Sequence, residues 1–293
     1  MKAHGCQSMV APVRRMLLKH PRDAFISQPH LEAAWRALHY GSCPDFERAL
    51  SEYARFVGIL EQLGVEIHFA PADERTSLDS LYIHDPLVIT ERGAILCSMG
   101  KAARVAEPEA MAIVMERLGI PVLGAISGSG RLEGGDVLWL DDRTLAVGQG
   151  FRTNAEGLRQ LRELLGDAVD EIIPVQLPYW SGPEECLHLL SFISIVDDDL
   201  AVVHSRLMPV PFREQLVARG FRFVEVPEAE YDSLGCNVLA VAPRACVMLS
   251  GNPVTQARLD EAGARVWTYE GAEISLKGTG GPTCLTRPVW RAR

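Results

Sequence analysis

Short apolar runs separated by polar turns recur along the chain and predict a series of β-hairpins. Four segments share the pattern, in which a mostly apolar run leads into a tight turn and a second apolar run follows. The paired runs are 85–90 with 94–97, 137–140 with 144–147, 192–196 with 200–203, and 238–241 with 245–249. We therefore expect four antiparallel hairpins.

A stretch of helical periodicity and a further short strand follow each predicted hairpin. The expected helices are 109–118, 155–165, 211–219 and 253–261, and the expected strands are 120–123, 171–175, 221–226 and 264–267. Glycine follows three of these helices, at Gly119, Gly220 and Gly263, as is typical of a helix C-terminus. A fifth, weaker unit combines a strand at 15–18, a helix at 46–63 and a strand at 65–69.

This β-β-α-β unit recurs every 45 to 56 residues, a period typical of propellers and solenoids. A solenoid needs capping ends, which the sequence does not show. We therefore predict an α/β propeller of five ββαβ units with pseudo-fivefold symmetry, forming a single catalytic domain over residues 1–293. Loops from every unit would then converge on a central site. A plain α/β sandwich is the alternative architecture.

Composition narrows the functional classes. The 293 residues are 47% hydrophobic and carry a net charge of −9, which disfavours nucleic-acid binding and suits a small cationic ligand. No run approaches the roughly 18 apolar residues of a membrane span, and the N-terminus has no apolar signal-peptide core. Seven scattered cysteines without a C-x-x-C motif argue against a disulfide framework or a structural zinc site. We expect a cytoplasmic protein without cofactor or metal, for which homo-oligomerisation stays open.

The most distinctive chemical motif is Lys277-Gly278-Thr279-Gly280-Gly281-Pro282-Thr283-Cys284. Glycines let a ligand approach the main chain closely, so this frame can place a thiol at the floor of a pocket. His188 lies in an apolar run beside the third hairpin, where a hydrogen-bonded core histidine is the simpler interpretation. A nearby thiol would instead make it a catalytic base.

Acidic and basic residues occupy the edges of the first two units. Glu133 opens a Glu-Gly-Gly-Asp turn, and Asp79 and Asp85 precede the first hairpin. Arg104 and Arg152 follow the second strands of the first two hairpins at similar offsets, and arginine binds carboxylates in a bidentate manner. Each could equally be a turn residue, a helix cap or a surface charge. In a ring, the acids would point toward one pocket.

Together these segments resemble the guanidino-group-modifying, or amidinotransferase, superfamily, whose five-bladed α/β propeller is called the pentein fold. The similarity runs from about Asp79 to Trp290, and it is closest to the dimethylarginine dimethylaminohydrolase group. The matching stretches are 79–86, 100–104, 132–137, 151–157, 187–192 and 278–284.

The resemblance implies a hydrolase that cleaves a C–N bond of a guanidino compound. Cys284 would be the nucleophile, His188 the general acid and base, and Glu133 the carboxylate that holds the guanidinium and orients the histidine. The implied reaction converts an Nω-methylated arginine to citrulline and an alkylamine through a thiouronium on Cys284, without a metal. An amidinotransferase, an arginine deiminase or dihydrolase, and a non-enzymatic binding module of the same fold are the alternatives.

The resemblance also implies substrate contacts. Asp85 would bind the guanidinium, Asp79 would lie near the α-ammonium, and Arg104 and Arg152 would clamp the α-carboxylate. The dimethylarginine hydrolases have Glu-Asp, and the deiminases and amidinotransferases Arg-Asp, where this chain has His84-Asp85. His84 either contacts a different substituent of the guanidine or braces Asp85, and this leaves the exact substrate open.

Overall fold

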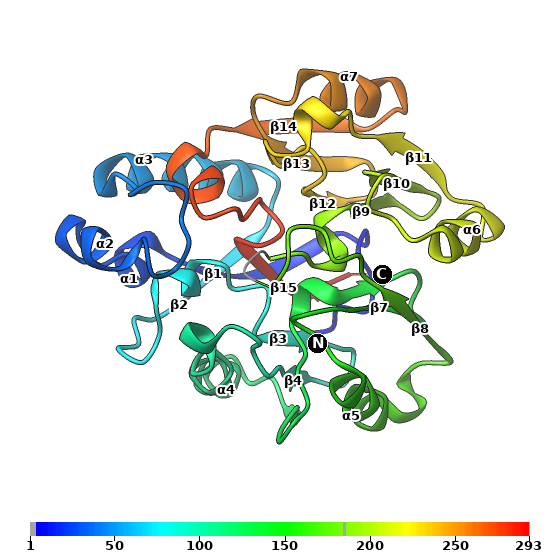
Figure 1. Ribbon diagram of the computed structural model, residues 1–293, viewed down its shortest axis with the longest axis horizontal. Helices are drawn as coiled ribbons and strands as arrows, with labels where there is room; N and C mark the ends of the chain where they lie inside the picture. Colours follow the sequence, from blue (N-terminus) through cyan, green and yellow to red (C-terminus); the bar gives the residue numbers. More distant parts are fainter. Residues whose placement is uncertain (1–3, 184–185, 293) are drawn as a thin grey trace.

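The computed structural model describes residues 4–183 and 186–292 and shows a mixed α/β fold with five three-stranded sheets (Figure 1). Within each sheet, the central strand pairs antiparallel with one neighbour and parallel with the other. Four sheets are built from consecutive strands: β3 (Leu87–Ile89), β4 (Ala94–Leu96) and β5 (Val122–Ala125); β6 (Val137–Trp139), β7 (Thr144–Gln149) and β8 (Glu171–Gln176); β9 (Ile193–Asp197), β10 (Leu200–Val203) and β11 (Arg222–Glu225); and β12 (Val238–Ala242), β13 (Ala245–Leu249) and β14 (Arg265–Tyr269). The predicted hairpins and their following strands are thereby confirmed.

A helix connects the second and third strands of each of these sheets. The four helices are α4 (Glu107–Arg117), α5 (Ala155–Leu165), α6 (Val210–Ala218) and α7 (Pro253–Glu261), and their bounds agree with the predicted ranges to within two residues. Gly119, Gly220 and Gly263 follow their helices with φ of 66°, 88° and 82°. These left-handed conformations are the ones for which glycine is selected at a helix C-terminus.

The fifth sheet joins the two ends of the described chain. β1 (Val13–Lys19) pairs in parallel with β2 (Glu66–Ala70), and α3 (Phe46–Gln62) lies between them in sequence. The antiparallel partner of β1 is β15 (Thr286–Arg291), which the sequence pattern did not indicate. β1 (blue) and β15 (red) cross near the centre of the molecule in Figure 1. The segment that carries Cys284 is therefore fixed to the N-terminal region.

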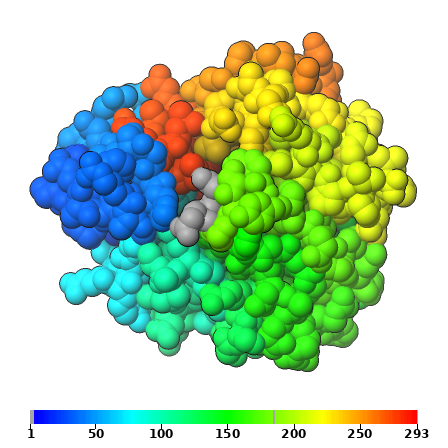
Figure 2. All heavy atoms as spheres, in the orientation of Figure 1, coloured from blue at the N-terminus to red at the C-terminus, as the bar shows by residue number. Residues whose placement is uncertain are grey.

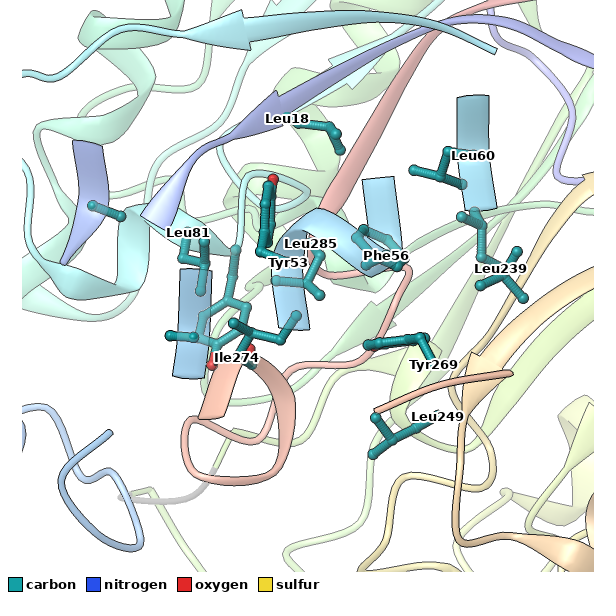
Figure 3. Close-up of a cluster of buried hydrophobic side chains, with 14 of the residues drawn as sticks. Leu18, Tyr53, Phe56, Leu60, Leu81, Leu239, Leu249, Tyr269, Ile274 and Leu285 are labelled. Atoms are coloured by element: carbon teal, nitrogen blue, oxygen red, sulfur yellow. Dashed lines mark hydrogen bonds between the residues drawn. The ribbon is translucent and has the colours of Figure 1, made fainter. Parts of the chain in front are cut away.

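Helix α3 packs its apolar face against the neighbouring sheet (Figure 3). Its buried residues Tyr53, Phe56 and Leu60 recur at helical spacing, and the Asp45 side chain caps its first turn. These three side chains belong to one hydrophobic cluster with Leu249 and Tyr269. Residues of the short helices α1 (Pro21–Ala24) and α2 (Gln28–Ala34) belong to the same cluster. Each fully buried large apolar side chain contributes about 1.5–3 kcal/mol to such packing.

Figure 2 shows the same face as atoms, with the blue N-terminal helices in contact with the orange-red segment near the C-terminus. This contact places the N-terminal layer, formed by helices α1 to α3, beside the loop that leads to Cys284. In the described ranges, every helix is too short or too polar to cross a membrane.

Candidate active site

The loop before β15 places the thiol of Cys284. It follows a π-helical turn, η7 (Ala272–Leu276), whose first amides donate to the Glu52 carboxylate of α3. Gly280 is required because a β-carbon there would lie 2.3 Å from the ring of Tyr82. Asn237, immediately before β12, accepts a hydrogen bond from the Thr283 amide (3.0 Å) and donates one to Sγ of Cys284 (3.3 Å). Cys284 precedes β15 in one sheet, and the side chain that donates to its sulfur precedes β12 in another.

Burial, together with the neighbouring Asp85 carboxylate, raises the pKa of the Cys284 thiol to about 11. The hydrogen bond from Asn237 and the charge of His188 act in the opposite direction and only partly offset this. Cys284 is accordingly a neutral thiol at pH 7. A cation bound next to Sγ would favour the thiolate, because an opposite charge stabilises the ionised form.

His188 and Glu133 form a buried pair. Nε2 of His188 lies 2.7 Å from Oε2 of Glu133, and Oε1 of Glu133 accepts a hydrogen bond from the Gly100 amide at 2.7 Å. Nη1 of Arg152 donates to both carboxylate oxygens at 3.4 Å. Burial opposes ionisation of Glu133. The hydrogen bond with His188 and the positive charge of that residue nevertheless hold the pKa of Glu133 below its usual value. Glu133 is therefore in hydrogen-bond contact with the imidazole, and its role in orienting the catalytic histidine stays a prediction.

His188 is an imidazolium at neutral pH in this environment. Burial would lower its pKa, but Cys186, Asp85 and Asp136 together raise it well above the ordinary value. Nδ1 of His188 lies 3.5 Å from Sγ of Cys186 and 3.9 Å from Oδ1 of Asp85. Among the described residues, the thiol in contact with His188 is thus that of Cys186, and no hydrogen bond joins His188 to Cys284. A direct Cys284–His188 pair is not formed, so the two groups would act from different sides of a bound molecule.

Asp85 is held in place by Arg104. Nη1 of Arg104 lies 2.6 Å from Oδ2 of Asp85, and Nε and Nη2 bind the Glu107 carboxylate at 2.9 and 2.8 Å. Nη2 also donates to the Tyr82 carbonyl at 2.8 Å. The guanidinium of Arg104 is buried and committed to protein groups, so in this conformation it is a partner of Asp85 rather than a free ligand for a substrate carboxylate. The expected clamp does not appear in this arrangement.

Asp79 is paired with Lys101, a residue that the sequence interpretation passed over. Nζ of Lys101 lies 2.6 Å from Oδ2 of Asp79 and donates a hydrogen bond to the Leu38 carbonyl at 2.8 Å. The Asp79 contact is an ion pair without hydrogen-bond alignment, since Oδ2 has no hydrogen-bond partner. The ammonium group of Lys101 is thus already paired with Asp79, the carboxylate that was expected to bind the α-ammonium of a substrate. Lys101 lies three residues before Arg104, in a segment already selected for its basic side chain.

His84 lies behind this cluster. Its Nδ1 is 2.9 Å from the Thr286 carbonyl at the start of β15, and its side chain is buried. Burial, with the nearby charge of Arg287, lowers the pKa of His84 to about 3, so the ring is neutral. The contact with β15 favours a bracing role for His84 over contact with the guanidine.

The ligand atoms of Asp85, Glu133 and His188 lie within 4.8 Å of one another, a spacing that could hold a cation. Each of the two carboxylates already has an arginine partner and the histidine is protonated, which disfavours a metal ion. The expectation of a metal-free site stays a prediction.

Five ββαβ sheets with a cysteine on a glycine loop facing an acid–histidine cluster define a member of the guanidino-group-modifying superfamily, as the sequence resemblance implied. The profile of the arginine deiminase family matches residues 78–215 and 210–291, and the chain belongs to that family.

Individual relatives agree with this family assignment. The chain is 29% identical to the N(G),N(G)-dimethylarginine dimethylaminohydrolase of Pseudomonas aeruginosa, over 85% of this chain and 91% of that protein. The solved structure of a cysteine-to-serine mutant of the P. aeruginosa enzyme, complexed with citrulline, superposes with a TM-score of 0.75 at 24% identity, covering 94% of this chain and 98% of the other. SxtG, an amidinotransferase from Microseira wollei, gives a TM-score of 0.79 at 15% identity, covering 99% and 98%. The structural matches establish the fold.

Proposed function

We propose that this protein hydrolyses a C–N bond of a guanidino compound, specifically an Nω-methylated arginine, releasing citrulline and an alkylamine. The observation that carries the proposal is the cluster of two buried, ionised acids, Asp85 and Glu133, around a protonated His188, with Cys284 near enough for the charges of Asp85 and His188 to shift its pKa. The similarity to the dimethylarginine dimethylaminohydrolase of P. aeruginosa over most of both chains supports the choice of substrate.

The acids would receive the substrate guanidinium, which stays charged because its pKa exceeds about 12. Asp85 and Glu133 would fix the plane of the cation and bring its central carbon over Sγ of Cys284. At the other end of the substrate, the α-ammonium would replace Nζ of Lys101 at Asp79. The released Lys101 would then pair with the α-carboxylate, in place of the buried Arg104.

Substrate binding would also prepare the nucleophile. The pKa of Cys284 lies near 11 without a ligand, and a guanidinium beside Sγ favours loss of the thiol proton to solvent. The thiolate forms an S–C bond with the central carbon, and the imidazolium of His188 gives its proton to the departing alkylamine as the C–N bond breaks. A cationic thiouronium remains on Cys284.

Neutral His188 would then act as a base in the second half of the reaction. It takes a proton from water, and the oxygen attacks the thiouronium carbon. The C–S bond breaks, Cys284 leaves as the thiolate, and the remaining proton on the added oxygen is lost to solvent as the neutral ureido group of citrulline forms. Each turnover returns His188 to its protonated form, which the pKa of this buried residue favours at neutral pH.

We further infer that the five sheets close into a ring around a common axis, as a single domain. One cavity is lined by residues from β3, β6, β9, β12 and β15, one strand of each sheet. Pairing of β1 with β15 supports closure, because it joins the two ends of the repeat series. A cytoplasmic location stays a prediction.

The test is mass spectrometry of products from arginine, monomethylarginine and asymmetric dimethylarginine, each with and without glycine or lysine. We expect citrulline with methylamine or dimethylamine. Cys284→Ser and His188→Ala should abolish turnover without unfolding the protein, whereas Cys43→Ser, at a cysteine of similar exposure on the N-terminal layer, should retain it. Near wild-type turnover by either site variant would contradict the mechanism.

The alternatives give different products in the same experiment. Citrulline and ammonia from unmodified arginine would identify a deiminase. Ornithine that appears only with an added amine would identify an amidinotransferase. No product with any of these compounds would leave a different guanidine, or the non-enzymatic binding module, as the explanation.

A further inference from the structure

A cavity of about 30 Å³ with a mixed polar and apolar lining lies next to His84, the residue before Asp85. Its lining includes Arg287 and Arg291 of β15, together with Cys6, Ser8 and Ser194. The imidazole of His84 also borders it, so the cavity and the reacting groups are separated by little more than one layer of side chains.

Two guanidinium groups meet at this cavity without an acidic partner. Arg287 and Arg291 are 7% and 5% exposed, so both side chains are buried. Within the described chain, neither forms an ion pair with a carboxylate: Nη2 of Arg287 donates to the His84 carbonyl, and Nη1 and Nη2 of Arg291 donate to the carbonyls of Ala11 (2.6 Å) and Ala240 (2.9 Å). Nε of each arginine is buried with no hydrogen-bond partner.

Buried cations of this kind need compensation. Removing a charge from water is strongly unfavourable unless an opposite charge or several hydrogen bonds replace the solvent. Burial lowers the pKa of Arg287, and the nearby charge of Arg291 also lowers it, whereas the Asp85 carboxylate raises it. The polar groups that line the cavity beside the arginines are the thiol of Cys6, the hydroxyls of Ser8 and Ser194 and a neutral His84, and no carboxylate is among the lining residues.

We propose that this cavity binds a small monovalent anion of halide size, held by Nε of Arg287 and Nε of Arg291. A cavity holds a water-sized particle when its volume, measured in this way, exceeds about 10–15 Å³. The volume of about 30 Å³ therefore suits a monatomic anion and is too small for a phosphate ester or an amino acid. Bound there, the anion would offset one of the two positive charges and stabilise β15, the strand that follows Cys284.

The direct experiment is diffraction from crystals of the full chain grown or soaked in sodium bromide, with data collected at the bromine absorption edge. We expect an anomalous peak in the cavity, within hydrogen-bond distance of both Nε atoms. Density that refines as water, with no anomalous peak there, would overturn the proposal. This measurement uses the unaltered protein and does not depend on turnover, so it is independent of the proposed reaction.

A solution measurement tests the energetic role. The melting temperature is compared in sodium chloride, bromide and acetate at constant ionic strength. Ligand linkage predicts a saturable rise of roughly 3 °C or more in the halides over acetate. Arg291→Gln should remove this difference, whereas Arg206→Gln, which deletes an exposed arginine, should retain it. Equal melting temperatures in all three salts, or a halide effect that persists unchanged in Arg291→Gln, would show that no such site exists.

Discussion

Replacement of Asn237 by alanine isolates the contribution of one hydrogen bond to the nucleophile. In the structure, Nδ2 of Asn237 donates to Sγ of Cys284 at 3.3 Å. A hydrogen bond to a charged group is worth about 1.5–3 kcal/mol, and one pKa unit corresponds to about 1.4 kcal/mol. The pKa of Cys284 should therefore rise by about 1–2 units in the variant.

The expected rate change follows from this shift. At pH 8 the thiolate fraction falls about 10- to 100-fold, and the higher basicity of the remaining thiolate restores about half of the loss on a logarithmic scale. Alkylation of Cys284 by iodoacetamide should thus slow about 3- to 10-fold, as followed by peptide mass spectrometry over a range of pH. The rate of Cys43 in the same samples is the internal control.

A second variant separates the donor from the acceptor. Asn237→Asp keeps an oxygen for the Thr283 amide but replaces the donor to Sγ by a negative charge. It should react more slowly than Asn237→Ala. An unchanged alkylation rate in a folded Asn237→Ala protein, or faster reaction of Asn237→Asp, would refute the reasoning that Asn237 stabilises the thiolate.

Three further perturbations test the surroundings of the site. Lys101→Ala should raise KM about tenfold, equivalent to about 1.4 kcal/mol, with little change in kcat in steady-state assays; a lower KM would mean that Lys101 only competes with the substrate for Asp79. His84 has its pKa lowered to about 3, so only the unfolded state binds this proton between pH 6.5 and 3, and stability falls as the pH drops through that window. In urea unfolding from pH 6.5 to 4.5, His84→Gln should lose roughly 2 kcal/mol less than the wild type, since the full slope of about 1.4 kcal/mol per unit is reached only below the unfolded pKa, and parallel curves would contradict this. Arg104→Gln leaves two buried carboxylates, of Asp85 and Glu107, without their ion pair and should cost about 3–5 kcal/mol, whereas a loss below about 1 kcal/mol in the same assay would mean that the pair is not needed.

The repeat architecture was predictable because its signals are local. Each hairpin has its own polar turn, and each crossover helix has its own apolar period, so neighbouring residues carry the information. β15 lacks such a signal. Its partner β1 lies at the opposite end of the chain, and its buried Arg287 and Arg291 look like surface residues in a sequence. Their hydrogen bonds to the carbonyls of His84, Ala11 and Ala240 form only in the fold, so the sequence does not indicate them.

The grouping of the acids with His188 was predictable but their pairings were not, and the role of Cys284 as nucleophile stays a prediction. The structure brings Asp85, Glu133 and His188 together, as the sequence suggested. Asp85 lies 19 residues before Arg104, and a pairing between such distant positions leaves no local pattern. The i,i+3 pair of Arg104 with Glu107 is local, but the sequence does not show that both side chains are buried. The role of Asn237 was also missed.

One signal could have drawn attention to Asn237. It immediately precedes β12, just as Asp136 immediately precedes β6, and Asp136 accepts a hydrogen bond from the amide that follows His188. A polar residue at the same place in two repeats is an indication of a shared role at the inner end of the first strand. A comparison of equivalent repeat positions would therefore have selected it.

The pairing of β1 with β15 also sets the order in which a growing chain can mature. Four sheets are local in sequence, so each can form soon after its third strand leaves the ribosome. β1 is synthesised first among the strands but lacks its antiparallel partner until β15 is made, and meanwhile exposes an unpaired edge that is prone to aggregate. Because Cys284 lies just before β15, the nucleophile reaches its position only when this last strand docks. A partly synthesised chain can thus hold folded sheets and an acid cluster and still be chemically inert.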